Sequence, residues 1–155
     1  MSTFLKMSEA SSLAFHTMAY LALHGDRLVS TQEISKKLGA SGNHLSKILQ
    51  RLVHSGFVRS TRGPSGGFRI REGWESVKLL DIYEAIEGPL GPSECFLDIP
   101  VCQGHKCALG ALAGTIDAEV RKCLTETTIA DLAKTFPMQD CDVYQETGYL
   151  KKSMN

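Results

Sequence analysis

Apolar residues recur at helical spacing through the first third of the chain and predict three helices. Residues 10–23 carry apolar side chains at positions 14, 18, 21 and 22, which indicates a largely buried first helix. The run Ser30-Thr31-Gln32-Glu33 matches a capping box, in which Ser30 caps the Glu33 amide while Glu33 reaches back. We therefore expect a second, short helix that ends at Gly39.

A glycine-containing turn, residues 39–42, follows the second helix, and Ser41 is placed to cap a third. That third helix ends at Gly56 and has an i, i+3, i+4, i+7, i+8 apolar stripe of Leu45, Ile48, Leu49, Leu52 and Val53. Two short helices joined by a glycine turn match the helix–turn–helix pattern.

Two short strand-like runs, 57–61 and 68–71, flank the turn Arg62-Gly63-Pro64-Ser65-Gly66-Gly67. Because this turn is rich in residues that tolerate or impose unusual backbone angles, we expect a two-stranded wing. Residues 76–87 then predict another short amphipathic helix, which Gly88 and Pro89 end.

From Ala108 to about Leu124 a long apolar seam runs through positions 109, 112, 113, 116 and 120, and Cys123 continues it as an expected core residue. A small domain has limited means of covering such a seam, so we expect two copies to dimerise through it. The alternative is that the helix packs wholly on its own domain. Residues 128–135 predict a last short helix, and the tail from Phe136 is polar and expected to be poorly ordered.

The predicted fold class is mainly α with a small β wing: a winged helix–turn–helix DNA-binding domain plus a long dimerisation helix. We divide the 155 residues into a DNA-binding domain (1–88), a cysteine loop (89–107), a dimerisation region (108–135) and a polar tail (136–155). The chain begins without a secretory pattern and contains no apolar run of eighteen residues. We therefore expect a cytoplasmic protein whose thiols stay reduced.

Charge is divided unevenly, although the formal net charge is zero. Residues 1–71 hold ten Lys or Arg against three acids, whereas residues 72–155 hold seven against fourteen. This asymmetry favours a polyanionic partner for the first half, double-stranded DNA in particular. The alternative is that the two halves attract each other.

The polar side of the third helix carries side chains suited to a major groove. Asn43, Lys47 and Gln50 point away from the apolar stripe, and Asn and Gln can bond adenine bidentately. The first helical turn usually contacts bases, and a wing can enter a minor groove or lie along phosphates. The predicted DNA-contacting residues are Ser41, Asn43, His44, Ser46, Lys47, Gln50, Arg51, Arg59, Arg62, Gly63 and Ser65.

Three cysteines, Cys95, Cys102 and Cys107, lie within thirteen residues in ECFLDIPVCQGHKC. A thiolate is both a soft metal ligand and the reactive form of cysteine. A basic helix–turn–helix followed by such a cluster suggests a DNA-binding protein that responds to a metal, to redox state or to a reactive gas. We find no nucleophile motif, phosphate-binding glycine loop or acid–base pair, so we do not expect an enzyme.

The run NHLSKILQRLVHSGFVRSTRGPSGGFRI resembles the recognition helix and wing of the bacterial IscR/NsrR/CymR family of winged-helix regulators. The later SVKLLDIYEAIEG and the three cysteines before a long helix also fit, and the resemblance covers roughly residues 5–135. It implies a homodimer that binds an imperfect palindrome. It also implies that Cys95, Cys102 and Cys107 hold a 2Fe–2S or 4Fe–4S cluster.

The chain departs from the two cluster-bearing prototypes at the fourth ligand. Gly110 stands where IscR-like proteins have a histidine, and Ser12 stands where NsrR-like proteins have an aspartate. Glu9, His16 or His105 could replace them, as could solvent or a small thiol. The cysteine spacing, C-x6-C-x4-C, also differs from that of the prototypes.

Three other interpretations of the cysteines stay open. Cys95, Cys102, His105 and Cys107 could form a zinc site, although they lack the paired C-x2–4-C spacing. The thiols could instead form a reversible disulfide switch, or they could be inert. A CymR-like regulator controlled by a partner enzyme is the corresponding alternative for the whole protein.

Overall fold

The computed structural model describes residues 7–91, 95 and 107–136. The predicted fold class is confirmed: helices dominate and one small antiparallel sheet accompanies them. The elements, in chain order, are α1 (Glu9–His24), α2 (Thr31–Leu38), α3 (Gly42–His54), β1 (Val58–Thr61), β2 (Gly67–Ile70), the 3-10 turn η1 (Trp74–Ser76), α4 (Leu79–Glu87), α5 (Ala108–Glu126) and α6 (Ile129–Thr135).

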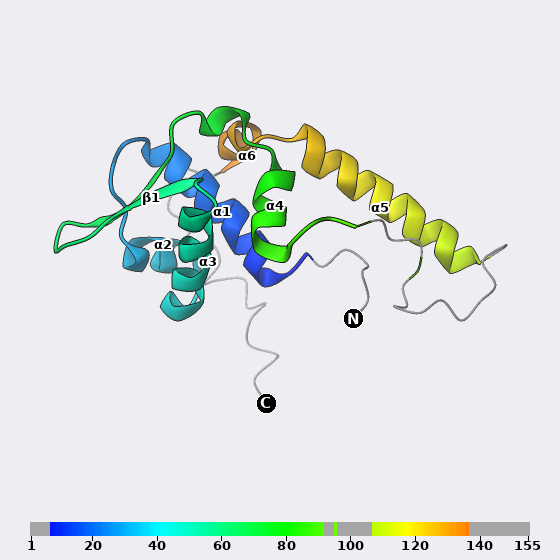
Figure 1. The fold of residues 1–155 in the computed structure, drawn as a ribbon, viewed down its shortest axis with the longest axis horizontal. Helices are drawn as coiled ribbons and strands as arrows, with labels where there is room; N and C mark the ends of the chain where they lie inside the picture. The colour runs from blue at the N-terminus through cyan, green and yellow to red at the C-terminus, as the bar shows by residue number, and fades with distance from the viewer. Residues whose placement is uncertain (1–6, 92–94, 96–106, 137–155) are drawn as a thin grey trace, which may run out of the picture.

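Helix α1 is the centre of the core, and α2, α3, α4, α6 and the wing strand β2 all pack against it (Figure 1). Met18 and Leu21 are completely buried, as are Ile34 on α2 and Leu45 on α3. A helix surrounded by partners needs apolar or small side chains on most of its faces, and the sequence of α1 supplies them. This core holds the helix–turn–helix in place.

The start of α2 confirms half of the predicted capping box. The Ser30 hydroxyl accepts a hydrogen bond from the Glu33 amide at 3.1 Å. The Glu33 carboxylate does not return to Ser30, and it accepts hydrogen bonds from Arg27 at 2.5 and 3.1 Å and from the Tyr20 hydroxyl at 3.1 Å. A charge-assisted pair with a guanidinium is stronger than a bond to a neutral amide, so Arg27 takes this carboxylate.

The turn between α2 and α3 forms as predicted. Gly39 ends α2 in the left-handed conformation (φ 62°), which glycine adopts at little cost. The Ser41 hydroxyl then caps α3 by accepting a hydrogen bond from the His44 amide at 3.1 Å. Both ends of the turn are therefore fixed by local backbone chemistry.

The wing is a β-hairpin fastened to the body of the domain. Val58 pairs with Ile70 at its buried base, and Thr61 pairs with Gly67 toward the tip. Val29, in the loop between α1 and α2, exchanges two backbone hydrogen bonds of 2.8 Å with Phe68. This third strand-like contact fixes the direction of the wing relative to the helix–turn–helix.

The fourth helix begins later than predicted. Instead of starting at residue 76, the chain makes the turn η1 over Trp74–Ser76, and α4 starts at Leu79. The Lys78 amide donates to the Asp81 carboxylate at 3.0 Å, which stabilises the start of α4. The Leu79 amide donates to the Thr127 carbonyl at 3.0 Å, which ties this start to the chain just before α6.

Helix α5 extends away from the domain on the side opposite the wing (Figure 1). Ala113 and Leu124 are buried against the chain itself, whereas Leu109 is 62% exposed and Leu112 is 50% exposed. The apolar seam is thus divided: Leu124 belongs to the domain core, Ala113 is buried outside that core, and Leu109 and Leu112 are exposed. Cys123 is exposed, so the prediction that it belongs to the core was wrong. At 100° per residue it falls on the side of Leu112, away from Ala113 and Leu124.

The predicted last helix is confirmed as α6, and the Thr128 hydroxyl caps it. Phe136, predicted as the start of a loose tail, instead packs on α1. Its ring lies 6.0 Å from that of His16 and 6.3 Å from that of Tyr20, measured between centroids. Within the described residues, no helix is long and apolar enough to cross a membrane.

Candidate nucleic-acid interface and cysteine loop

The outer face of α3 presents the three side chains predicted to read bases. Asn43, Lys47 and Gln50 are exposed. Leu45 and Leu49, on the opposite side of the same helix, are completely buried. The apolar stripe therefore fixes the rotation of α3 and turns these three polar side chains to solvent.

The other predicted residues at the start of α3 have backbone hydrogen bonds of their own. The Ser41 hydroxyl accepts from the His44 amide, and the Ser46 hydroxyl donates to the Gly42 carbonyl at 2.7 Å. His44 is half-buried. Among the predicted residues of this helix, the side chains of Asn43, His44, Lys47 and Gln50 form no hydrogen bond inside the described part of the chain, and His44 is the half-buried one.

Arg51 connects the recognition helix to α4. Its Nη1 donates a 2.8 Å hydrogen bond to the Ile86 carbonyl, in the last turn of α4. A helix C-terminus has unsatisfied carbonyls and favours positive charge. Sequence reasoning missed this contact because it joins residues 35 positions apart. The prediction that Arg51 contacts DNA stays untested.

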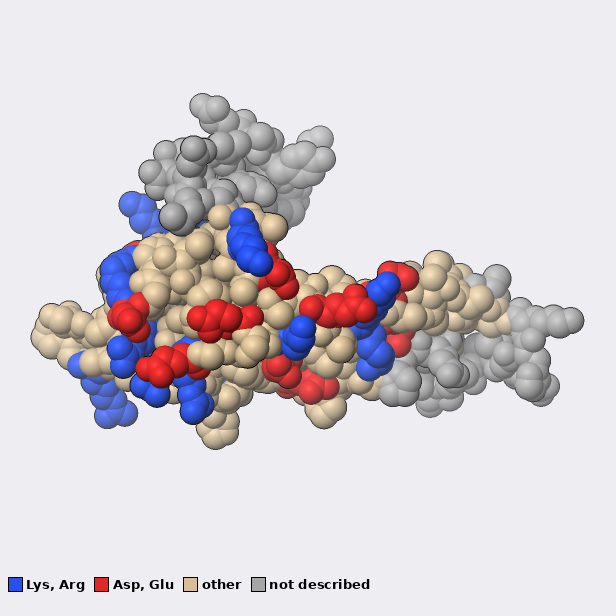
Figure 2. Space-filling view, turned by 90° about the horizontal axis from the view of Figure 1, so that it is seen from above, with Lys and Arg blue, Asp and Glu red and all other residues tan. Residues whose placement is uncertain are grey.

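The wing tip is open to solvent. Arg59, Arg62, Gly63 and Ser65 are all exposed. Gly63 adopts a φ of 117°, which favours glycine. Figure 2 shows many of the Lys and Arg side chains gathered at the end of the molecule that carries the wing, with acidic side chains spread along its middle. On this face, basic side chains are thus more frequent toward the wing, although acidic ones also lie among them.

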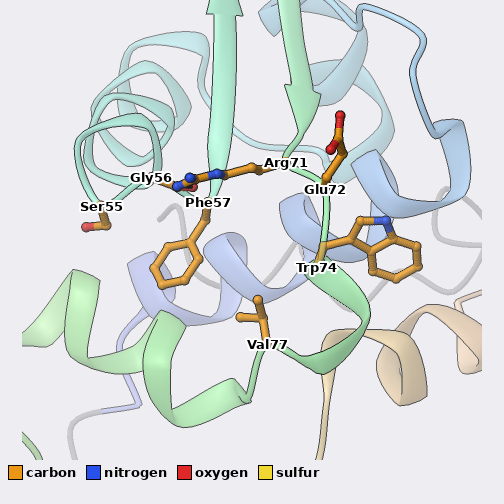
Figure 3. Close-up of a pocket in the computed structure, with 7 residues that line it drawn as sticks. All are labelled: Ser55, Gly56, Phe57, Arg71, Glu72, Trp74 and Val77. Atoms are coloured by element: carbon orange, nitrogen blue, oxygen red, sulfur yellow. Dashed lines mark hydrogen bonds between the residues drawn. The ribbon is translucent and has the colours of Figure 1, made fainter.

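A cavity of about 270 Å³ lies at the base of the wing (Figure 3). The rings of Phe57 and Trp74 and the side chain of Val77 form its apolar part. The Arg71 side chain points toward Gly56 and donates to its carbonyl at 3.2 Å. This bond braces the hairpin where it leaves the body of the domain.

Cys107 lies at the start of α5 as its N-cap residue. Its sulfur accepts a hydrogen bond from the Gly110 amide at 3.3 Å. A helix N-terminus favours negative charge, and N–H···S bonds are among the contacts that tune protein-bound iron–sulfur clusters. Cys95 is half-buried, while Cys102 and His105 lie outside the described residues. The described part of the donor set therefore fits a thiolate-bound metal group in its chemistry.

Arg121 of α5 holds the beginning of the cysteine loop. Its guanidinium donates to the Leu90 carbonyl at 3.1 Å and to the Gly91 carbonyl at 3.0 Å. Asp117, one turn earlier on α5, accepts from the same guanidinium at 3.3 Å. The i, i+4 spacing of Asp117 and Arg121 can be seen in the sequence. The sequence does not show that Arg121 also binds the two backbone carbonyls at the start of the cysteine loop.

Two of the proposed fourth ligands, Glu9 and His16, are exposed on α1. Glu9 is in the first turn, where the hydroxyls of Ser8 and Ser11 donate to the Glu87 carboxylate at the end of α4. Since the cysteine loop follows α4 directly, Glu9 lies near the beginning of that loop. His16 lies seven residues further along α1, roughly 10 Å away. Its Nδ1 is 2.7 Å from the Ser12 carbonyl.

A gathered metal site is not visible in the part of the chain that the structure describes: no three His, Cys, Asp or Glu side chains come together there. Two of the three predicted cysteine ligands fall inside this part and one falls outside. The ligand set, including the fourth ligand, thus stays a prediction.

Several known proteins with a similar sequence or fold are transcriptional regulators. The profile of the Rrf2 family, described as iron-dependent transcriptional regulator, matches residues 7–135. Protein aau3 of Rhizobium meliloti is 29% identical over 137 residues, covering 86% of this chain and 88% of that protein. The HTH-type transcriptional regulator IscR of Vibrio atlanticus is 23% identical over 156 residues, covering 96% and 90%.

The fold is similar to that of solved regulators as well. The structure of CymR, the global cysteine regulator of B. subtilis, superposes with a TM-score of 0.70 at 26% identity, covering 86% of this chain and 99% of CymR. The resemblance to IscR/NsrR/CymR regulators is confirmed, and the expectation that the protein is not an enzyme agrees with it. The chain therefore belongs to the Rrf2 family and is a DNA-binding transcriptional regulator.

Proposed function

We propose that this regulator acts as a homodimer whose affinity for a palindromic operator is controlled by an iron–sulfur cluster on Cys95, Cys102 and Cys107. The observation that carries the proposal is the position of Cys107. It caps α5, the helix proposed to dimerise, and its sulfur accepts a backbone N–H. A change of charge at this sulfur acts directly on the end of that helix.

The exposed apolar residues of α5 support the dimer. Leu109 and Leu112 are large, exposed and one turn apart on the projecting half of the helix. A second copy of the same helix would cover them, and a two-fold axis would then set the spacing of two recognition helices. Paired half-sites in DNA require such fixed spacing.

A short series of contacts leads from the cysteine loop to the recognition helix. Arg121 ties the beginning of the loop to α5, and Arg51 ties the end of α4 to α3. The cluster, when bound, supplies a charge and a geometry that change with oxidation, nitrosylation or loss. Coupling between two sites of this kind is typically about 1–3 kcal/mol, or about 5–150-fold in operator affinity.

A second candidate is a cluster-free regulator, controlled by a thiol switch or by a partner enzyme. The similarity to CymR, the global cysteine regulator of B. subtilis, favours it. The two candidates differ in what the purified protein contains. A cluster protein isolated without oxygen is coloured and contains iron and sulfide, a zinc protein contains zinc alone, and a cluster-free regulator contains none of these.

The reading of bases by α3 is tested on an operator recovered by selection from random duplexes. Asn43→Ala and Gln50→Ala should each weaken operator binding by about 1–3 kcal/mol, because a bidentate contact to adenine is lost. Binding to random DNA should barely change. Equal losses on all sequences would contradict direct readout by this face, since they would indicate contacts to phosphate alone.

A further inference from the structure

Two arginines lie directly opposite each other on the wing. In the register of β1 and β2, Arg59 pairs with Arg69. Facing residues of an antiparallel pair have Cβ atoms about 5 Å apart, and like charges at such positions destabilise the hairpin. This arrangement requires an explanation, because β1 and β2 supply no acid to either arginine.

The alternation of the hairpin fixes the face on which this pair lies. Val58 and Ile70 are buried on one face, and Ser60 and Phe68 follow them on that face. Arg59, which is exposed, and Arg69, which is half-buried, therefore lie on the other, outer face. Thr61 and Gly67 come next on the outer face toward the tip. A Cβ at Gly67 would lie 2.7 Å from the Val29 carbonyl oxygen, so the Val29 segment covers this face at Gly67.

The surrounding acids do not neutralise the pair. Within the described residues, neither Arg59 nor Arg69 forms an ion pair. Glu33, in the helix that follows the strand-like residue Val29, is held by Arg27 and Tyr20. Arg71, the next arginine on the outer face, donates to the Gly56 carbonyl. Arg71 keeps its charge there, and Arg59 and Arg69 thus face each other with no acid of the described residues paired to either.

We infer that Arg59 of β1 and Arg69 of β2 together bind one backbone phosphate of DNA. An anion between two guanidinium groups converts their repulsion into two attractive, charge-assisted contacts. Arg69 is thereby a DNA-binding residue on the second strand of the wing. The inference rests on the DNA-binding function. It adds a phosphate-binding site on the paired strands of the wing, between the buried base and the tip.

The test measures the binding of a random 30-base-pair duplex and of the selected operator, by fluorescence anisotropy over a series of salt concentrations. Arg69→Ala should weaken both by about tenfold at 0.1 M salt and reduce the slope of log K against log salt by about one, as expected for one lost phosphate. Arg69→Lys should keep the slope, since it keeps the charge. Lys122→Ala, an exposed base on α5, is the matched control and should change neither.

The double variant Arg59→Ala/Arg69→Ala tests whether the phosphate is shared. If both arginines hold one phosphate, the loss in the double variant is clearly smaller than the sum of the single losses. Additive losses would overturn the shared phosphate site, because they would indicate that the two arginines bind separate phosphates.

Thermal unfolding without DNA, at low salt, gives a second readout. Arg69→Ala should unfold at the same temperature as the wild type or higher, because like-charge repulsion is removed, and added inorganic phosphate should stabilise the variant less. Unchanged affinity and slope in Arg69→Ala, with normal wild-type binding, would overturn the inference alone. Wild-type protein that binds neither duplex would overturn the DNA-binding function with it.

Discussion

Replacing both Leu109 and Leu112 by glutamate should separate the proposed dimer into folded monomers. Both side chains are exposed in the single chain, at 62% and 50%, so glutamate meets water there and the monomer should lose little stability. In a two-fold interface the same residues are buried, and a charge buried without a partner is strongly unfavourable. The substitutions therefore act on association and spare the fold.

The magnitude follows from the exposed fractions. Complete burial of a leucine side chain contributes about 1.5–3 kcal/mol, and roughly half of each side chain is still exposed. Each leucine thus has roughly 1 kcal/mol to gain, and a two-fold interface contains four of them. The loss is therefore roughly 4 kcal/mol, or about a thousandfold in the dimer dissociation constant, before any cost of the buried charges.

Sedimentation or light scattering over a range of protein concentrations measures the result. Ala118→Glu is the matched control, because Ala118 is exposed on the opposite side of α5 and should leave the dimer intact. Circular dichroism of the double variant checks that the monomer is folded. A wild-type protein that is monomeric at micromolar concentration, or a double variant that stays dimeric, would refute this use of α5.

Two further predictions concern the wing and the acid stability of the domain. Gly66→Ala should disrupt the wing, because a Cβ there would lie against the Thr61 carbonyl oxygen. In an anisotropy assay the variant should bind both operator and random DNA more weakly. Wild-type affinity would show that the turn can adjust. The hydrogen bond from Arg27 lowers the pKa of Glu33, so this carboxylate stabilises the fold above the ordinary glutamate pKa and loses that contribution as the pH falls through its lowered value. Glu33→Gln should therefore remove part of the acid-side loss of stability in denaturant titrations, and an unchanged pH dependence would contradict the assignment.

Local patterns in the sequence were sufficient for most of the fold. Ser30, Gly39 and Ser41 bound their helices through contacts within four residues, and such contacts can be inferred from spacing alone. The wing was predictable for the same reason, since its turn chemistry is local. Phe136 was misplaced because its packing depends on α1, more than a hundred residues earlier.

Contacts between distant elements explain what the sequence did not predict. The face of α3 that could read bases followed from its apolar stripe, but the bond from Arg51 to the Ile86 carbonyl did not. Likewise, a period of 3.6 residues assigns Cys123 to an apolar seam without saying which side of that seam the domain covers. Backbone carbonyls as partners, and the choice between intramolecular and intermolecular burial, appear only in three dimensions.

The coupling of the cysteine loop to DNA binding is tested most directly by measuring operator affinity with and without an iron–sulfur cluster. The protein is reconstituted without oxygen, analysed for iron, sulfide and visible absorption, and titrated with the selected operator before and after the cluster is removed. The account predicts a chromophore that Cys95→Ser, Cys102→Ser and Cys107→Ser each lose or destabilise and that Cys123→Ser keeps. It also predicts a change of about 5–150-fold in operator affinity on removal of the cluster. A colourless protein without iron, whose operator affinity is indifferent to all three substitutions, would contradict it.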